Sequence, residues 1–297
     1  MPLTQCSNIT QAGQRCHRKV KGRAPTCWQH QSNQMGGKLL GEGGTGCVYK
    51  PALECQYKLN SNAGQEGLLM KVMNPCQGYD PLDPEADEES SDYMFTEDEI
   101  SKIIRTIDPE SQYFIPLSGD YCSLKQSQSN LEQLDGCEGY KHSDHKRQFR
   151  GYFMKDGGRV LEDYVMKNLN QMDIQLALNW ILHIAKALEI LHSYRIFHND
   201  AHWGNIVIDP VQKQPKFIDF GNTQIVPEGE TYNQALKDYE KSDMTRFYST
   251  VSGIYNANKI VFPKQSSVIA TALVDVFKGT YETPKKVIEF LTPLVKV

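Results

Sequence analysis

The fold of this chain is decided by the stretch FHNDAHWGNIVIDPVQKQPKFIDFG, which runs from residue 197 to residue 221. Asp200, Asn205 and Asp219 stand in this stretch. In phosphoryl transfer from a nucleotide, one Asp accepts the proton of the attacking hydroxyl, while an Asn and a second Asp hold metal ions on the phosphates. The three residues therefore predict a phosphoryl-transfer site.

The flanking residues predict the local structure of this site. Residues 205–209 and 216–219 are short apolar runs joined by a segment that begins and ends with proline, which indicates a β-hairpin. Before them, apolar residues recur at helical spacing between residues 174 and 191, and Asp173 is the candidate N-cap. We expect a long helix that leads into the loop carrying Asp200.

The motif HNDAHWGN at residues 198–205 is similar to the catalytic loop of the protein kinase superfamily, and Asp219-Phe-Gly matches its metal-binding motif. An isolated Asp-Phe-Gly can be a simple turn, but here both motifs follow a strong helical pattern. The resemblance covers about residues 38–260. It implies an α+β, two-lobed protein-kinase-like fold with an antiparallel-sheet small lobe and a mainly helical large lobe. Asp200 would then orient and deprotonate the acceptor hydroxyl, and Asn205 and Asp219 would bind Mg²⁺.

A glycine-rich motif of the form GxGxxGxV contains Gly41, Gly43, Gly46 and Val48. Glycines let a hairpin close over phosphates because no Cβ obstructs the backbone. The resemblance implies that these residues bind ATP, together with Lys71, the cation within the apolar run at residues 68–73. The corresponding kinase lysine contacts the α- and β-phosphates.

A lysine inside an apolar strand needs a charged partner. Glu99 lies three residues after a capping Thr96, at the start of an apolar stripe with helical spacing. We predict that Glu99 pairs with Lys71, with Glu97 as the alternative. Either carboxylate could instead be a solvated first-turn residue that the helix dipole stabilises.

Residues 148–158 resemble the kinase hinge, where backbone groups bind the edge of the adenine. Phe153 and Met154 are the predicted adenine-binding residues, and Tyr152 takes the gatekeeper position. The pair Gly157-Gly158 would let the chain cross between lobes. The assignment rests on position, because any residue supplies backbone groups.

Several residues depart from the usual kinase pattern. Asn199 stands where regulated kinases carry an Arg that receives an activation-loop phosphate, so we expect no such switch. His202 replaces a Lys and could stabilise the transferring phosphoryl group. The resulting HxDxHWGN resembles haspin and the minimal kinases of large DNA viruses. The segment after Gly221 is short, and Asp243 is expected to begin a central helix and brace the catalytic loop by hydrogen bonds.

The N-terminal segment carries candidate zinc ligands. Cys6, Cys16, Cys27 and His30 could hold one tetrahedral zinc ion, and the segment resembles small Cys3His modules of large DNA viruses and some microbes. Residues 1–38 carry a net charge of +6, against −4 for the whole chain. This module could bind nucleic acid or protein, or its charge could merely form a solvated face.

Length, composition and apolar runs indicate the domain organisation and the class of the protein. The 297 residues, 39% of them hydrophobic, suffice for one two-lobed domain with an appendage. We expect a zinc module at 1–36, a small lobe and hinge at 37–155, and a large lobe at 156–297. No signal peptide is visible, and the longest apolar run, around residues 268–277, is too short to span a bilayer. The prediction is a soluble intracellular protein without a membrane partner, in the host cytoplasm or the virion if it is viral.

The cysteines outside the N-terminal segment show no spacing pattern. In an intracellular protein, the eight cysteines are expected to be reduced or metal-bound rather than paired as disulfides. The residues without a pattern are Cys47, Cys55, Cys76, Cys122 and Cys137.

The sequence thus predicts an ATP- and Mg²⁺-dependent serine/threonine protein kinase of viral type, with a structural zinc ion, that phosphorylates a protein hydroxyl. Two alternatives stay open. One is a small-molecule kinase that uses the same nucleotide site. The other is a nucleotide-binding pseudokinase scaffold recruited by the zinc module.

Overall fold

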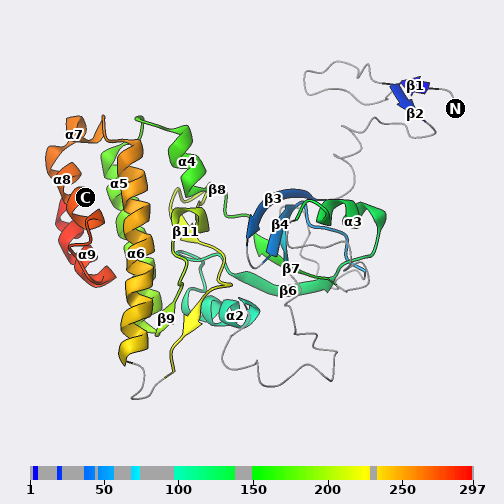
Figure 1. Cartoon of the computed structure of the whole chain (residues 1–297), viewed down its shortest axis with the longest axis horizontal. Helices are drawn as coiled ribbons and strands as arrows, with labels where there is room; N and C mark the ends of the chain where they lie inside the picture. The colour runs from blue at the N-terminus through cyan, green and yellow to red at the C-terminus, as the bar shows by residue number, and fades with distance from the viewer. Residues whose placement is uncertain are drawn as a thin grey trace. The chain divides into compact units, whose positions relative to one another are not determined.

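The structure is a computed structural model that describes residues 3–5, 19–21, 37–43, 46–56, 68–73, 97–137, 149–227 and 233–295 (Figure 1). The predicted zinc ligands Cys6, Cys16, Cys27 and His30 lie outside these residues, so the zinc module stays a prediction. In that part of the chain the structure describes one antiparallel pair, β1 (Leu3–Gln5) with β2 (Lys19–Lys21).

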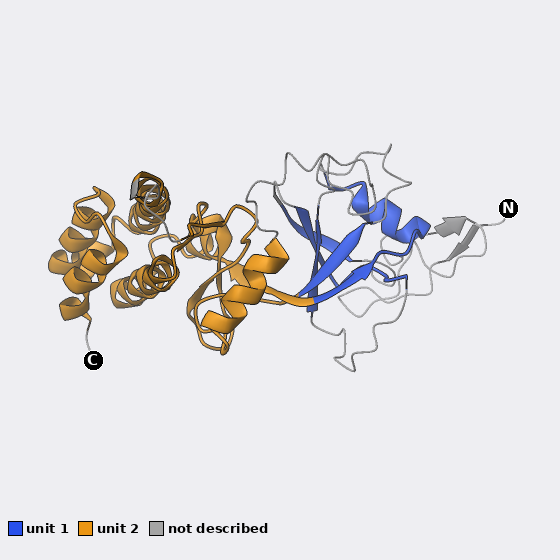
Figure 2. Ribbon diagram, turned by 90° about the horizontal axis from the view of Figure 1, so that it is seen from below, with its two compact units in different colours: residues 1–83, 120–153 blue, residues 84–119, 154–297 orange. Residues whose placement is uncertain are grey.

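The chain divides into two compact units (Figure 2). The first consists of residues 1–83 and 120–153, and the second of residues 84–119 and 154–297. Each unit has its own hydrophobic core. The boundary near residue 153 falls within the predicted hinge.

A five-stranded sheet organises the first unit, in the order β3-β4-β5-β7-β6. β4 pairs antiparallel with both β3 and β5. Tyr49, Met70 and Phe153 are among the buried side chains that form its core. The strands are β3 (Lys38–Gly43), β4 (Gly46–Lys50), β5 (Leu68–Met73), β6 (Leu117–Ser123) and β7 (Arg150–Lys155).

A short helix, α3 (Gln128–Leu134), follows β6 in the first unit. The sequence shows no clear period there, but Ser127 caps the helix by accepting a hydrogen bond from the backbone N–H of Asn130. The buried Asn130 side chain then donates to the backbone carbonyls of Glu54 and Lys125, at 2.8 Å each. The hydrogen bonds of Asn130 and the packing of Leu131 and Leu134 on the core of this unit together hold α3 in place.

The expectation of reduced or metal-bound cysteines is wrong for four of the eight. Cys47 is bonded to Cys137 and Cys55 to Cys122, with Cα–Cα distances of 6.1 and 5.7 Å. The bonded residues lie 90 and 67 positions apart in the sequence, so only the folded sheet brings them together. All four belong to the first unit.

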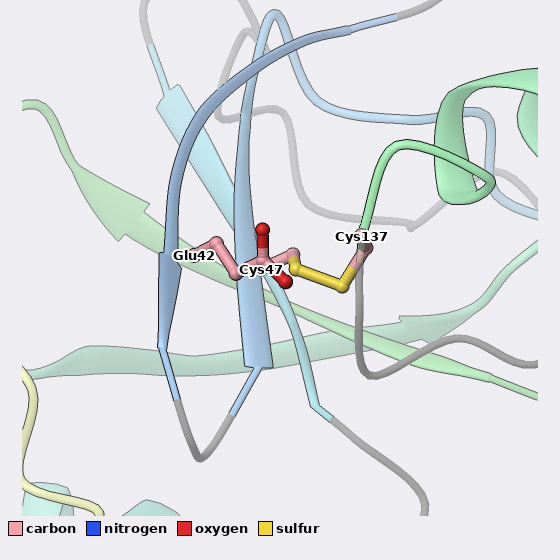
Figure 3. A group of neighbouring side chains, drawn as sticks. All are labelled: Glu42, Cys47 and Cys137. Carbon is pink, nitrogen blue, oxygen red and sulfur yellow. A yellow bond between two sulfur atoms is a disulfide. The ribbon is translucent and has the colours of Figure 1, made fainter.

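The carboxylate of Glu42 lies beside the Cys47–Cys137 disulfide (Figure 3). One ligand atom from each of these three residues falls within 4.8 Å of the others. Because the two sulfurs are bonded to each other, neither is a thiolate that could bind a metal ion. This group therefore does not support zinc binding.

Helices dominate the second unit. α5 (Ile174–Ser193) is its central helix and packs against α6 (Asn233–Ala257) and α9 (Pro284–Leu291), while α8 (Ser267–Phe277) packs on α6 (Figure 1). Asp173 caps α5 as predicted, because its Oδ1 accepts from the backbone N–H of Leu176 at 2.9 Å. The remaining elements are α2 (Glu97–Ile107), β8 (Arg159–Val160), α4 (Leu161–Lys167), β9 (Ile196–Phe197), η3 (Trp203–Asn205), β10 (Ile206–Ile208), β11 (Pro215–Phe217), β12 (Gln224–Ile225), α7 (Phe262–Gln265) and η5 (Thr292–Leu294).

By length and composition, α5 is long and apolar enough to cross a membrane. The sequence-based expectation named only the shorter apolar run around residues 268–277. Eleven residues of α5 are buried against the other helices, which is typical of the core helix of a folded domain. The antiparallel sheet in the N-terminal region and the helical C-terminal region are consistent with the predicted two-lobed fold.

The segment before β6 bends instead of forming a strand. Residues 113–116 read Tyr-Phe-Ile-Pro, and of these only Phe114 forms a bridge, with Phe217. The carboxylate of Asp108 accepts hydrogen bonds from three successive backbone N–H groups, those of residues 112–114. These bonds bend the chain, so the strand begins only at Leu117.

Candidate active site

The predicted hairpin forms and brings Asn205 next to the Asp219 motif. β10 and β11 pair antiparallel with Ile206 opposite Phe217, and the N–H of Ile218 donates to the carbonyl of Asn205 at 3.0 Å. Asn205 therefore lies across from Ile218, one residue before Asp219. The hairpin therefore explains why Asn205 and Ile218 lie close together although the whole turn separates them in the sequence.

An ion pair holds the turn end of this hairpin. Lys216 is buried on β11, and its Nζ lies 3.1 Å from Oδ2 of Asp209. Partial burial would raise the pKa of Asp209, but hydrogen bonds from the N–H groups of Gln212 and Val211 and the charge of Lys216 lower it below its ordinary value. The ionised carboxylate thus stabilises the hairpin.

The two carboxylate oxygens of Asp200 face different groups. Oδ2 accepts from Nδ2 of Asn205 at 3.0 Å and from Nδ2 of Asn222 at 3.4 Å. Oδ1 lies 3.5 Å from Nε2 of His202 and 3.9 Å from Nε of Arg246. One oxygen is therefore fixed by amides, and the other faces two basic side chains.

Asn205 and Asp219 suit a hard cation such as Mg²⁺, which prefers oxygen ligands. Nδ2 of Asn205 is directed to Asp200, which leaves the amide oxygen as the ligand atom. Asp219 adopts a left-handed backbone with φ of 61°, which Asp tolerates better than most residues. The adjacent Phe220 is buried and anchors the motif.

Asp243 on α6 braces the catalytic loop, as predicted. It is fully buried, and its Oδ2 accepts from the N–H of His198 at 3.0 Å while Oδ1 accepts from the N–H of Asn199 at 2.7 Å. Nε2 of His192, on α5, is 3.0 Å from Oδ2. The carboxylate therefore ties two helices to the residues that precede Asp200. α6 itself begins at Asn233, ten residues before the position at which the sequence places its start.

Asn199, which occupies the position of the kinase Arg, also bonds to α6. Its backbone is left-handed with φ of 59°, and its Oδ1 accepts from Oγ of Ser242 at 3.0 Å. The side chain therefore serves as a structural contact within this unit.

Trp203 in the same loop rests against α6. A Cβ added to Gly253 would lie 2.5 Å from the Trp203 ring, so only glycine allows this approach. The helix and the loop therefore fit closely at a second point beyond Asp243.

Lys71 and the glycine motif lie in the sheet of the first unit. Lys71 is 3% exposed and pairs in register with Val48. Gly46 has φ of 153°, and a Cβ there would lie 2.3 Å from the carbonyl oxygen of Val72, which explains the need for glycine. Gly41 is open on all sides, while Gly43 ends β3; residues 44–45 lie outside the described part of the chain.

The two candidate partners of Lys71 differ in burial. Both belong to the first turn of α2, where Glu97 is 5% exposed and Glu99 is exposed. A buried carboxylate needs a charged or hydrogen-bonding partner more than an exposed one does. Of the predicted hinge residues, Phe153 and Met154 are buried on β7, and Gly158 has φ of 93°, which favours glycine.

Sequence reasoning missed Arg246, Asn222 and His192. Arg246 lies three residues after Asp243 on α6, so helical periodicity places both on one face, and this signal could have identified it. Asn222 directly follows the Asp219 motif. His192 has no comparable sequence signal, because its contact with Asp243 spans 51 residues.

A comparison with known families matches part of the chain. Residues 146–277 match the family model of the protein kinase domain. The matched region includes Asp200, Asn205, Asp219 and Asp243. No curated protein matches the chain. The match supports the protein kinase superfamily and a phosphotransferase activity that uses ATP and Mg²⁺.

Proposed function

With a protein kinase domain as the premise, we propose that this protein is an ATP-dependent serine/threonine kinase of viral type that phosphorylates another protein. The hydrogen bond of 3.0 Å between Asp200 and Asn205 carries the proposal. It fixes the proton acceptor beside the residue that would hold a metal ion, and the hairpin sets Ile218, the residue before Asp219, across from Asn205. The HxDxHWGN motif supports the viral type.

The geometry supports a direct transfer of the γ-phosphoryl group. The acceptor oxygen would bond to the γ-phosphorus as the bond to the β,γ-bridging oxygen breaks, and ADP would leave with that electron pair. The hydroxyl proton would pass to Asp200, which the amides of Asn205 and Asn222 orient. Bound Mg²⁺ would supply positive charge to the phosphate oxygens.

In this proposal, the nucleotide is bound by the residues that the kinase resemblance assigns to it. Lys71 would contact the α- and β-phosphates, and Gly41, Gly43, Gly46 and Val48 would cover them. Backbone groups of Phe153 and Met154 would bind the edge of the adenine. Glu99 is the proposed partner of Lys71, and Glu97 is the second choice. Loss of ATP affinity in Glu99→Gln, with Glu97→Gln unaffected, would support the first choice, and the reverse order would support Glu97.

A small-molecule acceptor is the second candidate. Only residues 222–232 separate the Asp219 motif from α6. Protein kinases dock a peptide on this segment, so a short segment offers less surface for a protein substrate. The nucleotide site would be the same for both kinds of acceptor.

The zinc module and the cellular location remain proposals. The module would recruit a protein or a nucleic acid through its basic surface. If the protein is located in the host cytoplasm or the virion, its two disulfides would have to stay oxidised there. Because disulfides persist in oxidising surroundings, they favour an oxidising compartment or particle.

An assay with radiolabelled ATP tests the function and the acceptor together. The protein is mixed with a dephosphorylated protein lysate and, separately, with aminoglycosides, choline-like alcohols and sugars. We expect labelled serine and threonine sites, located by phosphosite mapping, that disappear with Asp219→Ala. Label only on small molecules would support the second candidate, and nucleotide binding without any transfer would refute both.

A further inference from the structure

One face of α6 contacts the catalytic loop at successive points. Ser242 and Asp243 bond to residues 198 and 199, and Gly253 lies against the ring of Trp203. Between these points, Arg246 reaches toward Asp200, with its Nε 3.9 Å from Oδ1. The close fit on both sides of Arg246 fixes the distance between its backbone and the loop.

The geometry of His202 makes it a poor substitute for a lysine. Its Nδ1 accepts a hydrogen bond from the N–H of Gly204 at 3.0 Å. A doubly protonated imidazole has an N–H on both nitrogens and cannot accept this bond. A Cβ on residue 204 would lie 2.6 Å from the His202 ring, so the glycine lets the ring take this position. In this arrangement Nδ1 of His202 is engaged within the loop, and only Nε2 faces Asp200.

Where many protein kinases place a permanent cation two residues after the catalytic Asp, this loop has an imidazole with only one nitrogen facing Asp200. Arg246 is a permanent cation, since a guanidinium does not lose its proton in proteins. It faces the same oxygen of Asp200 that His202 faces. Its side chain is 54% exposed, so the guanidinium is accessible from solvent.

We propose that Arg246 supplies the positive charge that the loop itself lacks. Its guanidinium orients Oδ1 of Asp200 and offsets negative charge at the reacting groups. Arg246 is thus a positioning residue that acts through Asp200, contributed by α6 rather than by the catalytic loop. This inference rests on the proposed function.

Steady-state kinetics with radiolabelled ATP and an acceptor of the wild-type protein test the proposal. Arg246→Gln removes the charge, and Arg246→Lys keeps it. The decisive variant combines His202→Lys with Arg246→Gln, which returns a cation to the loop. Lys241→Gln is the matched control, because Lys241 is an exposed cation on the same helix.

We expect Arg246→Gln to lower kcat roughly ten-fold, less than the loss of a donor in a dry site because the side chain is half exposed. The KM for ATP should change less than about two-fold, and Arg246→Lys should keep most of the activity. The double variant should recover to within about three-fold of the wild type, a rescue that a purely structural role for Arg246 would not produce.

Two results would overturn the inference alone: a kcat of Arg246→Gln equal to that of Lys241→Gln, or a loss that His202→Lys does not restore. Wild-type protein that transfers no phosphate to any acceptor would instead refute the proposed function, and the inference with it. The wild-type assay separates these two failures.

Discussion

Replacing Asp243 by Asn tests how α6 supports the catalytic loop. The buried carboxylate accepts from three donors, the N–H groups of His198 and Asn199 and Nε2 of His192, at 2.7–3.0 Å. Asn keeps the shape but turns one acceptor oxygen into an NH₂ group. Whichever way the amide lies, at least one buried donor then meets another donor.

The size of the effect follows from these contacts. A buried donor left without an acceptor costs about 1–3 kcal/mol, and bonds to a charged acceptor are stronger than neutral ones. We expect Asp243→Asn to lower the free energy of unfolding by about 2–4 kcal/mol. A shift of the loop should also lower kcat roughly 100-fold, because catalysis depends on the position of Asp200.

Urea unfolding and phosphate transfer, each compared with Asp238→Asn, provide the measurement. Asp238 lies on the same helix, and the structure gives it an exposed hydrogen bond from Gln234 at 3.0 Å. Its replacement should change stability by less than about 0.5 kcal/mol. Equal stability and equal kcat for the two variants would refute the bracing role of Asp243.

Three further predictions follow from local geometry. Gly253→Ala should destabilise the protein by about 1–3 kcal/mol in urea unfolding, because the new Cβ would clash with the Trp203 ring. Helix propensity alone predicts that the substitution stabilises the protein by about 1 kcal/mol, so a measured stabilisation would contradict the close approach. Asp209→Asn should cost about 1–2 kcal/mol at neutral pH by leaving the buried Lys216 unpaired. Because the pKa of Asp209 is lowered by folding, its contribution is present above the ordinary pKa of 3.8 and is lost in acid, so a difference that persists in acid would count against the ion pair. Reducing the two disulfides should lower the melting temperature, since each closes a long loop worth about 4 kcal/mol in chain entropy, and an unchanged melting temperature would contradict them.

The parts of the site that depend on local sequence could be predicted. The hairpin at residues 206–217 and the cap of α5 by Asp173 involve neighbours within one or two elements, so spacing and residue type were sufficient. The brace by Asp243 was predicted through the kinase resemblance, and two backbone hydrogen bonds confirm it.

Contacts between distant segments could not be predicted in the same way. The disulfides join residues that are far apart on different strands and loops, and the expectation of a reducing compartment argued against them. The choice of Glu99 over Glu97 as the partner of Lys71 rests on a capping pattern, and it stays a prediction. Helical periodicity could place Arg246 on the same face of α6 as Asp243, but its contact with Asp200 depends on how the loop folds against that helix.

Transfer of phosphate by purified protein is the most direct test of the central claim. Wild-type protein, Asp200→Asn and Asp173→Asn are incubated with radiolabelled ATP, Mg²⁺ and an acceptor identified from the lysate. Asp173 is the control because it is an exposed carboxylate that caps α5. We predict transfer by the wild type and by Asp173→Asn, and a loss of at least about 100-fold for Asp200→Asn. Equal transfer by all three proteins would contradict the assignment of Asp200 as the residue that accepts the hydroxyl proton.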